Sequence, residues 1–240
     1  MEYNDFTRVI NEKERGLDLQ AAFPALMRKV YGWMALALVI TGLTSYMVAS
    51  SPSLLYTIYG NQVVFWVMAL AELGIVIYVS ARINRISLTT GTVWFIIYSV
   101  LNGALMSYIF KVYTATSIST VFFITAGTFA AMAVVGTTTK KDLTRFGGIF
   151  FMALIGLLIA IVVNIFLMNT MLDMIISCVG VLIFVGLTAW DAQQIKQALL
   201  MAPDAGESAQ KIALLGALNL YLDFINLFLY LLRIFGRGDN

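Results

Sequence analysis

The sequence predicts an all-α integral membrane protein built as a bundle of seven transmembrane helices. Hydrophobic residues make up 60% of its 240 residues and charged residues only 12%, whereas a soluble domain has about 25% charged residues. The apolar residues fall into seven runs of roughly 20 residues, long enough at about 1.5 Å per residue to cross a hydrocarbon core of about 30 Å. Lysine and arginine gather in alternate connections between these runs, as they do in multi-pass membrane proteins.

The chain is expected to form one membrane domain with a short tail at each end. Residues 1–27 hold clustered charges and no long apolar run, so they are interpreted as an N-terminal tail, and residues 236–240 as a C-terminal tail. No small-residue cleavage site follows a short apolar core, which argues against a signal peptide. The membrane domain is residues 28–235, and its expected spans are 30–49, 63–81, 92–110, 117–136, 148–168, 173–190 and 213–232.

Three of these spans carry additional signals. Tyr31 and Trp33 begin the first span, where an interfacial aromatic belt is expected. The fourth span is rich in Ala, Gly and Thr, and small residues let helix backbones approach closely, so this span is expected inside the bundle. After Trp190 the sixth span turns polar, but its residues remain compatible with a helix to about Leu200.

The basic residues predict how the chain is oriented. With a cytoplasmic N-terminus, 12 of the 15 Lys and Arg residues fall in cytoplasmic segments. This bias predicts a cytoplasmic N-terminus and an external C-terminus. Arg233 and Arg237 count against it, because the short C-terminal tail would place both on the external side.

The composition also limits the function. There is no histidine, so the commonest general base, metal ligand and physiological pH switch are absent, and carboxylates must do any titrating. The net charge of +2 provides no electrostatic footprint for nucleic acid, and no nucleic-acid partner is expected.

Asp223 lies in the middle of the seventh span. An aspartate at the centre of a transmembrane helix costs about 2.5 to 3.5 kcal/mol, so it should face the protein interior or water and is a candidate functional residue. Asn219, Asn226 and Tyr230 share one helical stripe with it, at spacings of four and three residues. The asparagines and the tyrosine are equally compatible with a polar seam that joins helices, whereas joining helices does not require an ionisable group.

Other polar residues allow two interpretations each. Asp191, at the end of an apolar run, is either functional or an interfacial residue that pairs with Lys196 or with water. Glu72 lies at the midpoint of the second span, where a structural partner and a functional role are both open. Arg82, at the end of that span, suits a cation that anchors the helix at the interface.

Two motifs surround the aspartates of the last two spans. They are FVGLTAWDAQQIK at 184–196 and LYLDFINLFLYLLR at 220–233. Together they look like the paired signature of the transmembrane Bax inhibitor motif family, in its bacterial branch, and VYGWM at 30–34 and TKKDL at 139–143 also resemble that branch. The resemblance covers the whole membrane region. Ala192 departs from it, because bacterial relatives commonly carry threonine after the aspartate.

The resemblance implies six helices around a central seventh, acting as a pH-sensitive calcium leak of the bacterial inner membrane. It identifies Asp191 and Asp223 as a di-aspartyl pair that senses pH and binds calcium transiently. It also implies an arginine latch, for which Arg82 is the nearest counterpart, about one residue out of register. Calcium is then the transported ion, the lipid bilayer surrounds the protein, and no cofactor is expected.

The chemistry of these residues agrees with such a sensor. Two carboxylates in a low-dielectric site do not both ionise freely, so they share a proton and respond to pH as a pair. A guanidinium can clamp the ionised pair, and protonation weakens that clamp. Calcium prefers carboxylate, amide and carbonyl oxygens, and a conducting path needs incomplete ligation.

Alternatives remain open at this point. An intramembrane aspartyl protease also places two aspartates on neighbouring spans, but its Gly-x-Gly-Asp sequence is absent around Asp223, so no enzyme is expected. A non-conducting regulator that binds other membrane proteins or proteases, and proton-coupled transport of another substrate, are further alternatives. The depths of Asp191 and Asp223 differ when counted along their spans, so the two meet only if the sixth helix continues toward Leu200 or the seventh begins later than residue 213. We expect the first.

Overall fold

The computed structural model describes the backbone of residues 2–238 and the side chains of residues 14–238. This part of the chain is helical, apart from the connections between helices and an isolated bridge between Tyr113 and Gly238. The helices are α1 (Glu2–Ala49), α2 (Pro52–Tyr59), α3 (Gln62–Arg82), α4 (Leu88–Met106), α5 (Ile109–Val112), α6 (Ala115–Thr138), α7 (Gly147–Leu167), α8 (Thr170–Leu200) and α9 (Glu207–Phe235), with a 3₁₀ turn at Thr144–Phe146.

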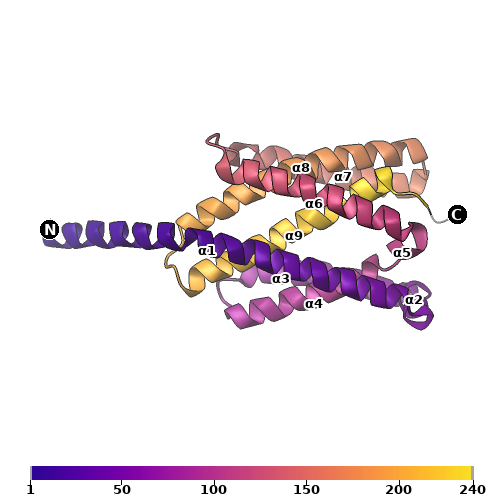
Figure 1. Ribbon diagram of the computed structural model, residues 1–240, viewed down its shortest axis with the longest axis horizontal. Helices are drawn as coiled ribbons and strands as arrows, with labels where there is room; N and C mark the ends of the chain where they lie inside the picture. The colour runs from indigo at the N-terminus through magenta and orange to yellow at the C-terminus, as the bar shows by residue number, and fades with distance from the viewer. Residues whose placement is uncertain (1, 239–240) are drawn as a thin grey trace.

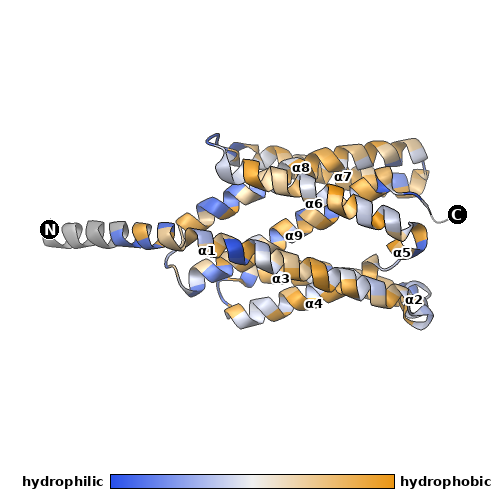
Figure 2. Ribbon diagram, viewed as in Figure 1, coloured by the Kyte–Doolittle hydropathy of each residue, from blue (hydrophilic) through white to orange (hydrophobic). Residues whose placement is uncertain are grey.

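The structure confirms the seven-helix membrane bundle. Seven helices are long and apolar enough to cross a membrane, whereas α2 and α5 are short connections. The three connections from α3 to α4, α6 to α7 and α8 to α9 lie at the end of the bundle from which the N-terminal part of α1 projects, and the C-terminus lies at the opposite end (Figure 1). Hydrophobic residues cover the length of the bundle between these ends (Figure 2).

α1 extends well beyond the first span. It is one continuous helix from Glu2 to Ala49 with Pro24 inside it, and its N-terminal part projects from the bundle (Figure 1). Leu19 and Leu26 are buried in the main hydrophobic core. The helix therefore runs without interruption through residue 27, where the N-terminal tail was expected to end.

α9 is the central helix. In its most apolar stretch 67% of the residues are buried, against 6% to 39% in the other six spans. It packs directly on α1, α4, α6 and α8, whereas α3 packs mainly on α4 and α7 on α8. α3 and α7 therefore form the outer layer, and their high hydropathy with little burial suits helices that face lipid.

Small residues on one face of α6 let a neighbouring helix approach closely. A Cβ atom added at Gly136 would lie 2.1 Å from the carbonyl oxygen of Ala189 on α8, so only glycine permits this approach. The opposite face is open, and Phe123 is 73% exposed. The expectation that this span lies inside the bundle was wrong, because α6 packs on α8 and α9 and leaves the rest of its surface exposed.

Candidate functional site: a buried pair of aspartates

The lengths of α8 and α9 bring the two sequence-predicted aspartates together. α8 continues without a break to Leu200, and α9 begins at Glu207, ahead of the expected residue 213. At about 1.5 Å per residue, Asp191 lies about 14 Å along its helix from Leu200 and Asp223 about 24 Å along its helix from Glu207. α9 crosses the bundle obliquely (Figure 1), which lets residues at different distances from the ends of their helices meet.

The carboxyl groups of Asp191 and Asp223 contact each other within hydrogen-bonding range. Their exposed fractions are 9% and 4%, so both are enclosed by protein in this conformation. An ionised carboxylate only accepts hydrogen bonds, so a hydrogen bond between the two requires at least one proton. Oδ2 of Asp223 is buried without a hydrogen-bond partner among the described residues, which leaves one oxygen of the pair able to bind a proton or a cation.

No basic side chain neutralises the pair. Among the residues that the structure describes, no Lys or Arg forms an ion pair with either aspartate. Lys196, one alternative partner of Asp191, instead donates to the backbone carbonyl of Thr137 on α6, at 2.7 Å. Two acidic groups in contact, enclosed and without a cation, form a site whose stability depends on a proton.

Arg82 does not reach the pair in this conformation. It is the last residue of α3, its side chain is exposed, and it forms no ion pair with any described residue. Because α3 lies in the outer layer, contact between Arg82 and the aspartates requires movement of the helix or of its C-terminal end.

The α8 residues that follow Asp191 hold down the connection between α6 and α7. Gln193 accepts a hydrogen bond from the backbone N–H of Leu143 at 2.7 Å, and its amide donates to the carbonyl of Lys141 at 2.9 Å. Lys196 holds the end of α6 as described above. These three bonds fix the connection against the part of α8 that begins two residues after Asp191. The sequence placed Gln193 and Lys196 in a polar segment but contained no signal for their partners.

The predicted polar stripe of α9 separates into individual contacts. Asn226 donates to the carbonyl of Leu222 in its own helix at 2.8 Å, and Asn219 is half-buried. Tyr230 stacks on Phe184 of α8 with ring centroids 5.8 Å apart. Within the stripe, Tyr230 therefore packs α9 against α8, and Asp223 contacts Asp191.

Glu72 belongs to a second polar cluster, on another side of α9. Its carboxyl group lies near the Asn102 side chain on α4, and its Oε1 atom is buried without a hydrogen-bond partner among the described residues. The Asn102 side chain accepts a hydrogen bond from the Tyr221 hydroxyl at 3.1 Å, and that hydroxyl also lies 2.7 Å from the hydroxyl of Thr41 on α1. Thr41 Oγ1 also lies 3.0 Å from the carbonyl oxygen of Ser99, and because each hydroxyl has one proton, two of these three contacts are hydrogen bonds at any one time. This cluster links α1, α3, α4 and α9.

Sequence analysis missed Tyr221 and Thr41 in this cluster. Tyr221 has 0% exposure and is the largest fully buried side chain among the described residues, which is unusual for a residue with a polar tip unless that tip has a partner. Its signal in the sequence was its place in the seventh span, two residues before Asp223. Its partners lie more than a hundred residues away.

The site has too few ligands to form a tight metal centre. No group of three or more Asp, Glu, Cys or His side chains comes together in the described part of the chain. Calcium takes about six to eight oxygen ligands, so the two carboxyl groups alone do not supply a full calcium coordination shell.

Comparison with known proteins gives the same family as the motifs. Residues 24–240 match the family model described as inhibitor of apoptosis-promoting Bax1. The chain is 44% identical over 219 residues to the inner membrane protein YbhL of Escherichia coli K12, covering 91% of this chain and 94% of that protein. It is 42% identical to an uncharacterized protein of Borreliella burgdorferi over 214 residues, covering 89% and 92% of the two chains. With protein RP147 of Rickettsia prowazekii the identity is 39% over 237 residues, covering 97% and 98%.

Proposed function

Because the chain belongs to the Bax inhibitor family, we propose that it is a pH-sensitive calcium leak channel with the Asp191–Asp223 pair as its proton sensor. Its seven apolar helices and its inner-membrane relative support a multi-pass protein of the bacterial inner membrane. The excess of basic residues at the end where the N-terminus lies supports a cytoplasmic N-terminus.

The observation that carries this proposal is the contact between the two buried carboxyl groups. Each sits on a different helix, α8 and α9, so the charge of the pair acts on the contact between these two helices. When the last proton leaves, two negative charges about 4 Å apart repel each other by about 4 kcal/mol at an effective dielectric constant of about 20. A cation must then enter, or the helices must separate.

Arg82 is the proposed cation for the ionised state. With the pair ionised, the guanidinium moves in, clamps both carboxylates and closes the path. With the pair protonated, the attraction is lost, Arg82 returns to the surface and α8 and α9 are free to part. The exposed Arg82 and the contact between the aspartates suit the protonated, unlatched state. Calcium flux therefore rises as pH falls.

The test is calcium uptake into proteoliposomes that contain only this protein, measured from about pH 6 to about pH 8. The native protein is expected to show more flux at lower pH, and Asp191→Asn and Asp223→Asn to lose that dependence, because an amide does not titrate. Asp173→Asn is the matched control, since this α8 carboxylate pairs with Arg233 at 3.1 Å instead of with the site. Arg82→Ala should raise flux at high pH.

Two results contradict the proposal. Flux no greater than that of empty vesicles favours a non-conducting regulator that binds other membrane proteins. A pH profile that neither substitution changes removes the pair from the sensing role. If Arg82→Ala leaves flux at high pH unchanged, Arg82 is an interfacial anchor and another cation meets the ionised pair.

A further inference from the structure

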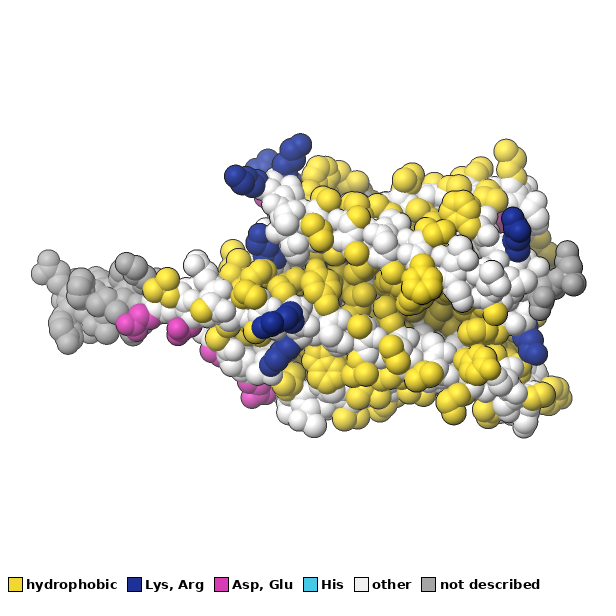
Figure 3. All heavy atoms as spheres, viewed as in Figure 1, with side chains coloured by type: hydrophobic (Ala, Val, Ile, Leu, Met, Phe, Trp, Pro, Cys, Tyr) yellow, Lys and Arg dark blue, Asp and Glu magenta, His cyan; other side chains and the backbone are white. Residues whose placement is uncertain are grey.

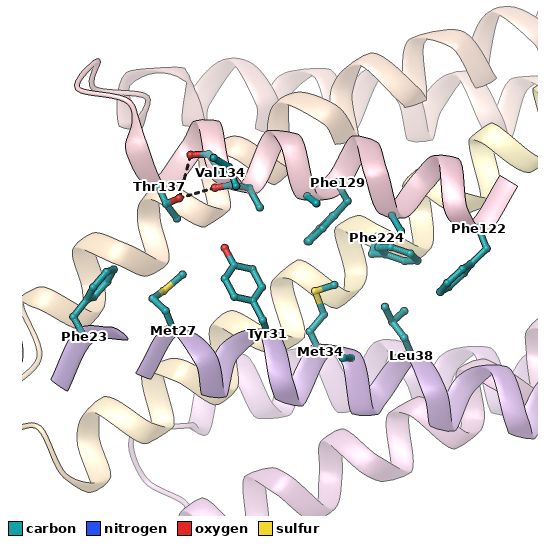
Figure 4. A pocket seen from close by; sticks show the side chains of 14 residues that line it. Phe23, Met27, Tyr31, Met34, Leu38, Phe122, Phe129, Val134, Thr137 and Phe224 are labelled. Atoms are coloured by element: carbon teal, nitrogen blue, oxygen red, sulfur yellow. Dashed lines mark hydrogen bonds between the residues drawn. The ribbon is translucent and has the colours of Figure 1, made fainter. Parts of the chain in front are cut away.

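An apolar groove runs between α1 and α6 along the side of the bundle. It encloses about 610 Å³. Met34 and neighbouring α1 residues form one wall, Phe129 and Ala133 of α6 form the other, and Phe224 of the central helix lines its floor (Figure 4). Phe129 and Phe224 lie with ring centroids 5.5 Å apart. We call this feature the α1–α6 groove.

The groove exists because α1 and α6 do not close on each other. Both helices pack on α9, but in the described part of the chain they make little direct contact with each other. Hydrophobic side chains line the gap and continue onto the surface around it (Figure 3). At this depth the surroundings are acyl chains, and water does not occupy an apolar cleft. The groove therefore takes an apolar occupant from the side.

One end of the groove is polar and positively charged. Thr137 lines this end, and Lys196 Nζ lies 2.7 Å from the Thr137 carbonyl. Arg28, next to the lining residue Met27, is exposed. Tyr31 points its hydroxyl across the groove toward α6 (Figure 4). Lys and Arg side chains gather at the end of the bundle from which α1 projects (Figure 3). An occupant with an apolar body and an anionic head matches this distribution.

We propose that the α1–α6 groove binds a single anionic phospholipid from the bilayer. One acyl chain lies along Met34 and Phe129 down to Phe224, and the phosphate lies near Lys196 and Arg28. The lipid completes the side of α9 that α1 and α6 leave open, and it touches the residue that follows Asp223. This assignment is independent of calcium transport, because its test measures bound lipid.

The test uses phosphatidylglycerol and phosphatidylcholine with identical acyl chains, added to the delipidated full-length protein in detergent. Bound lipid is counted by native mass spectrometry, and the unfolding midpoint is followed against lipid concentration. Native protein should retain one phosphatidylglycerol in preference to phosphatidylcholine. Lys196→Gln should weaken phosphatidylglycerol binding about fivefold, the factor given by about 1 kcal/mol per basic residue at a lipid surface.

A matched pair of substitutions tests the groove itself. Ala130 lines the groove, whereas Ala131 is exposed on α6 outside the lining. Ala130→Phe fills the groove and should weaken lipid binding about tenfold, and Ala131→Phe adds the same side chain without filling it and should bind as the native protein does. A photoreactive residue at the exposed lining position Val134 should label lipid in native membranes.

Several outcomes overturn the proposal. Equal binding to Ala130→Phe and Ala131→Phe places the lipid elsewhere. Equal retention of the two lipids by native protein removes the anionic head group from the assignment. Labelling from Val134 that yields another polypeptide instead of lipid makes the groove a protein-binding surface. The lipid preference of native protein decides the matter even if Ala130→Phe does not fold.

Discussion

Replacing Gly136 with alanine tests how tightly α6 holds the segment of α8 that carries Asp191. The added Cβ atom would lie 2.1 Å from the Ala189 carbonyl oxygen and 2.9 Å from the Ala189 Cα atom. Ordinary van der Waals contact begins at 3.4 Å, so α6 and α8 must separate by at least 1.3 Å, the difference between 3.4 and 2.1 Å. The obstacle is backbone, which cannot move aside by changing a rotamer. Such overpacking costs about 1 to 3 kcal/mol.

The assay for Gly136→Ala is thermal unfolding in detergent. Each kcal/mol lowers the unfolding midpoint by about 2 to 4 °C in a chain of this size. Gly127→Ala on the same helix is the matched control, because nothing lies within 4 Å of its added Cβ atom. Gly127→Ala should be neutral or slightly stabilising, since alanine is the better helix former by about 1 kcal/mol. If the two variants unfold at the same temperature, α6 and α8 are not held in the close contact that positions Asp191.

Three further predictions concern the groups around the site. Tyr221→Phe should lower the free energy of unfolding by about 0.6 to 1.7 kcal/mol, because interhelical hydrogen bonds are lost. Tyr98→Phe removes the hydroxyl of a neighbouring buried ring and should cost less in the same thermal unfolding experiment. Equal losses would assign the effect to packing. Gln193→Ala should speed amide exchange in the connection between α6 and α7, which Gln193 holds by two hydrogen bonds, and Gln194→Ala should not; unchanged exchange would mean that Lys196 alone suffices. Hydrogen bonds from the threonine two residues later lower the pKa of Asp142. The contribution of Asp142 to the order of the connection between α6 and α7 is therefore present above the ordinary carboxyl pKa and is lost as pH falls through the lowered value. Amide exchange in this connection that stays constant across this acid range, after correction for the intrinsic effect of pH on exchange, would refute the prediction.

Hydropathy and electrostatic cost predicted the fold and the aspartates for identifiable reasons. A span of about 20 apolar residues has few alternatives to a transmembrane helix, and a carboxylate within one is expensive enough to indicate Asp223 without any partner in view. The continuation of α8 to Leu200 followed from residues that favour a helix. The sequence did not show that α1 continues outward from residue 27, because charged residues neither stop nor start a helix there.

Contacts between distant spans could not be predicted from periodicity. The Thr41–Tyr221 bond joins residues 180 positions apart, and a helical stripe identifies the face on which a residue lies but not the helix that it meets. The position of Arg82 depends on the same missing information. Its sequence position allowed a latch, but the place of α3 in the outer layer keeps its side chain at the surface in this conformation.

α9 connects the two buried acidic sites physically. Asp223 contacts Asp191 on α8, and Tyr221, two residues earlier, bonds Thr41 on α1 and Asn102 on α4. Residues two apart on a helix point in directions about 200° apart, so the two sites hold α9 from opposite sides. A shift of α9 away from α8 therefore presses on or breaks the Tyr221 bonds, and a cluster that keeps Tyr221 in place resists separation of the aspartates. We therefore expect the effects of Tyr221→Phe and Asp223→Asn on stability to be non-additive in a double-mutant cycle. Additive effects would show that α9 does not transmit a displacement from one site to the other.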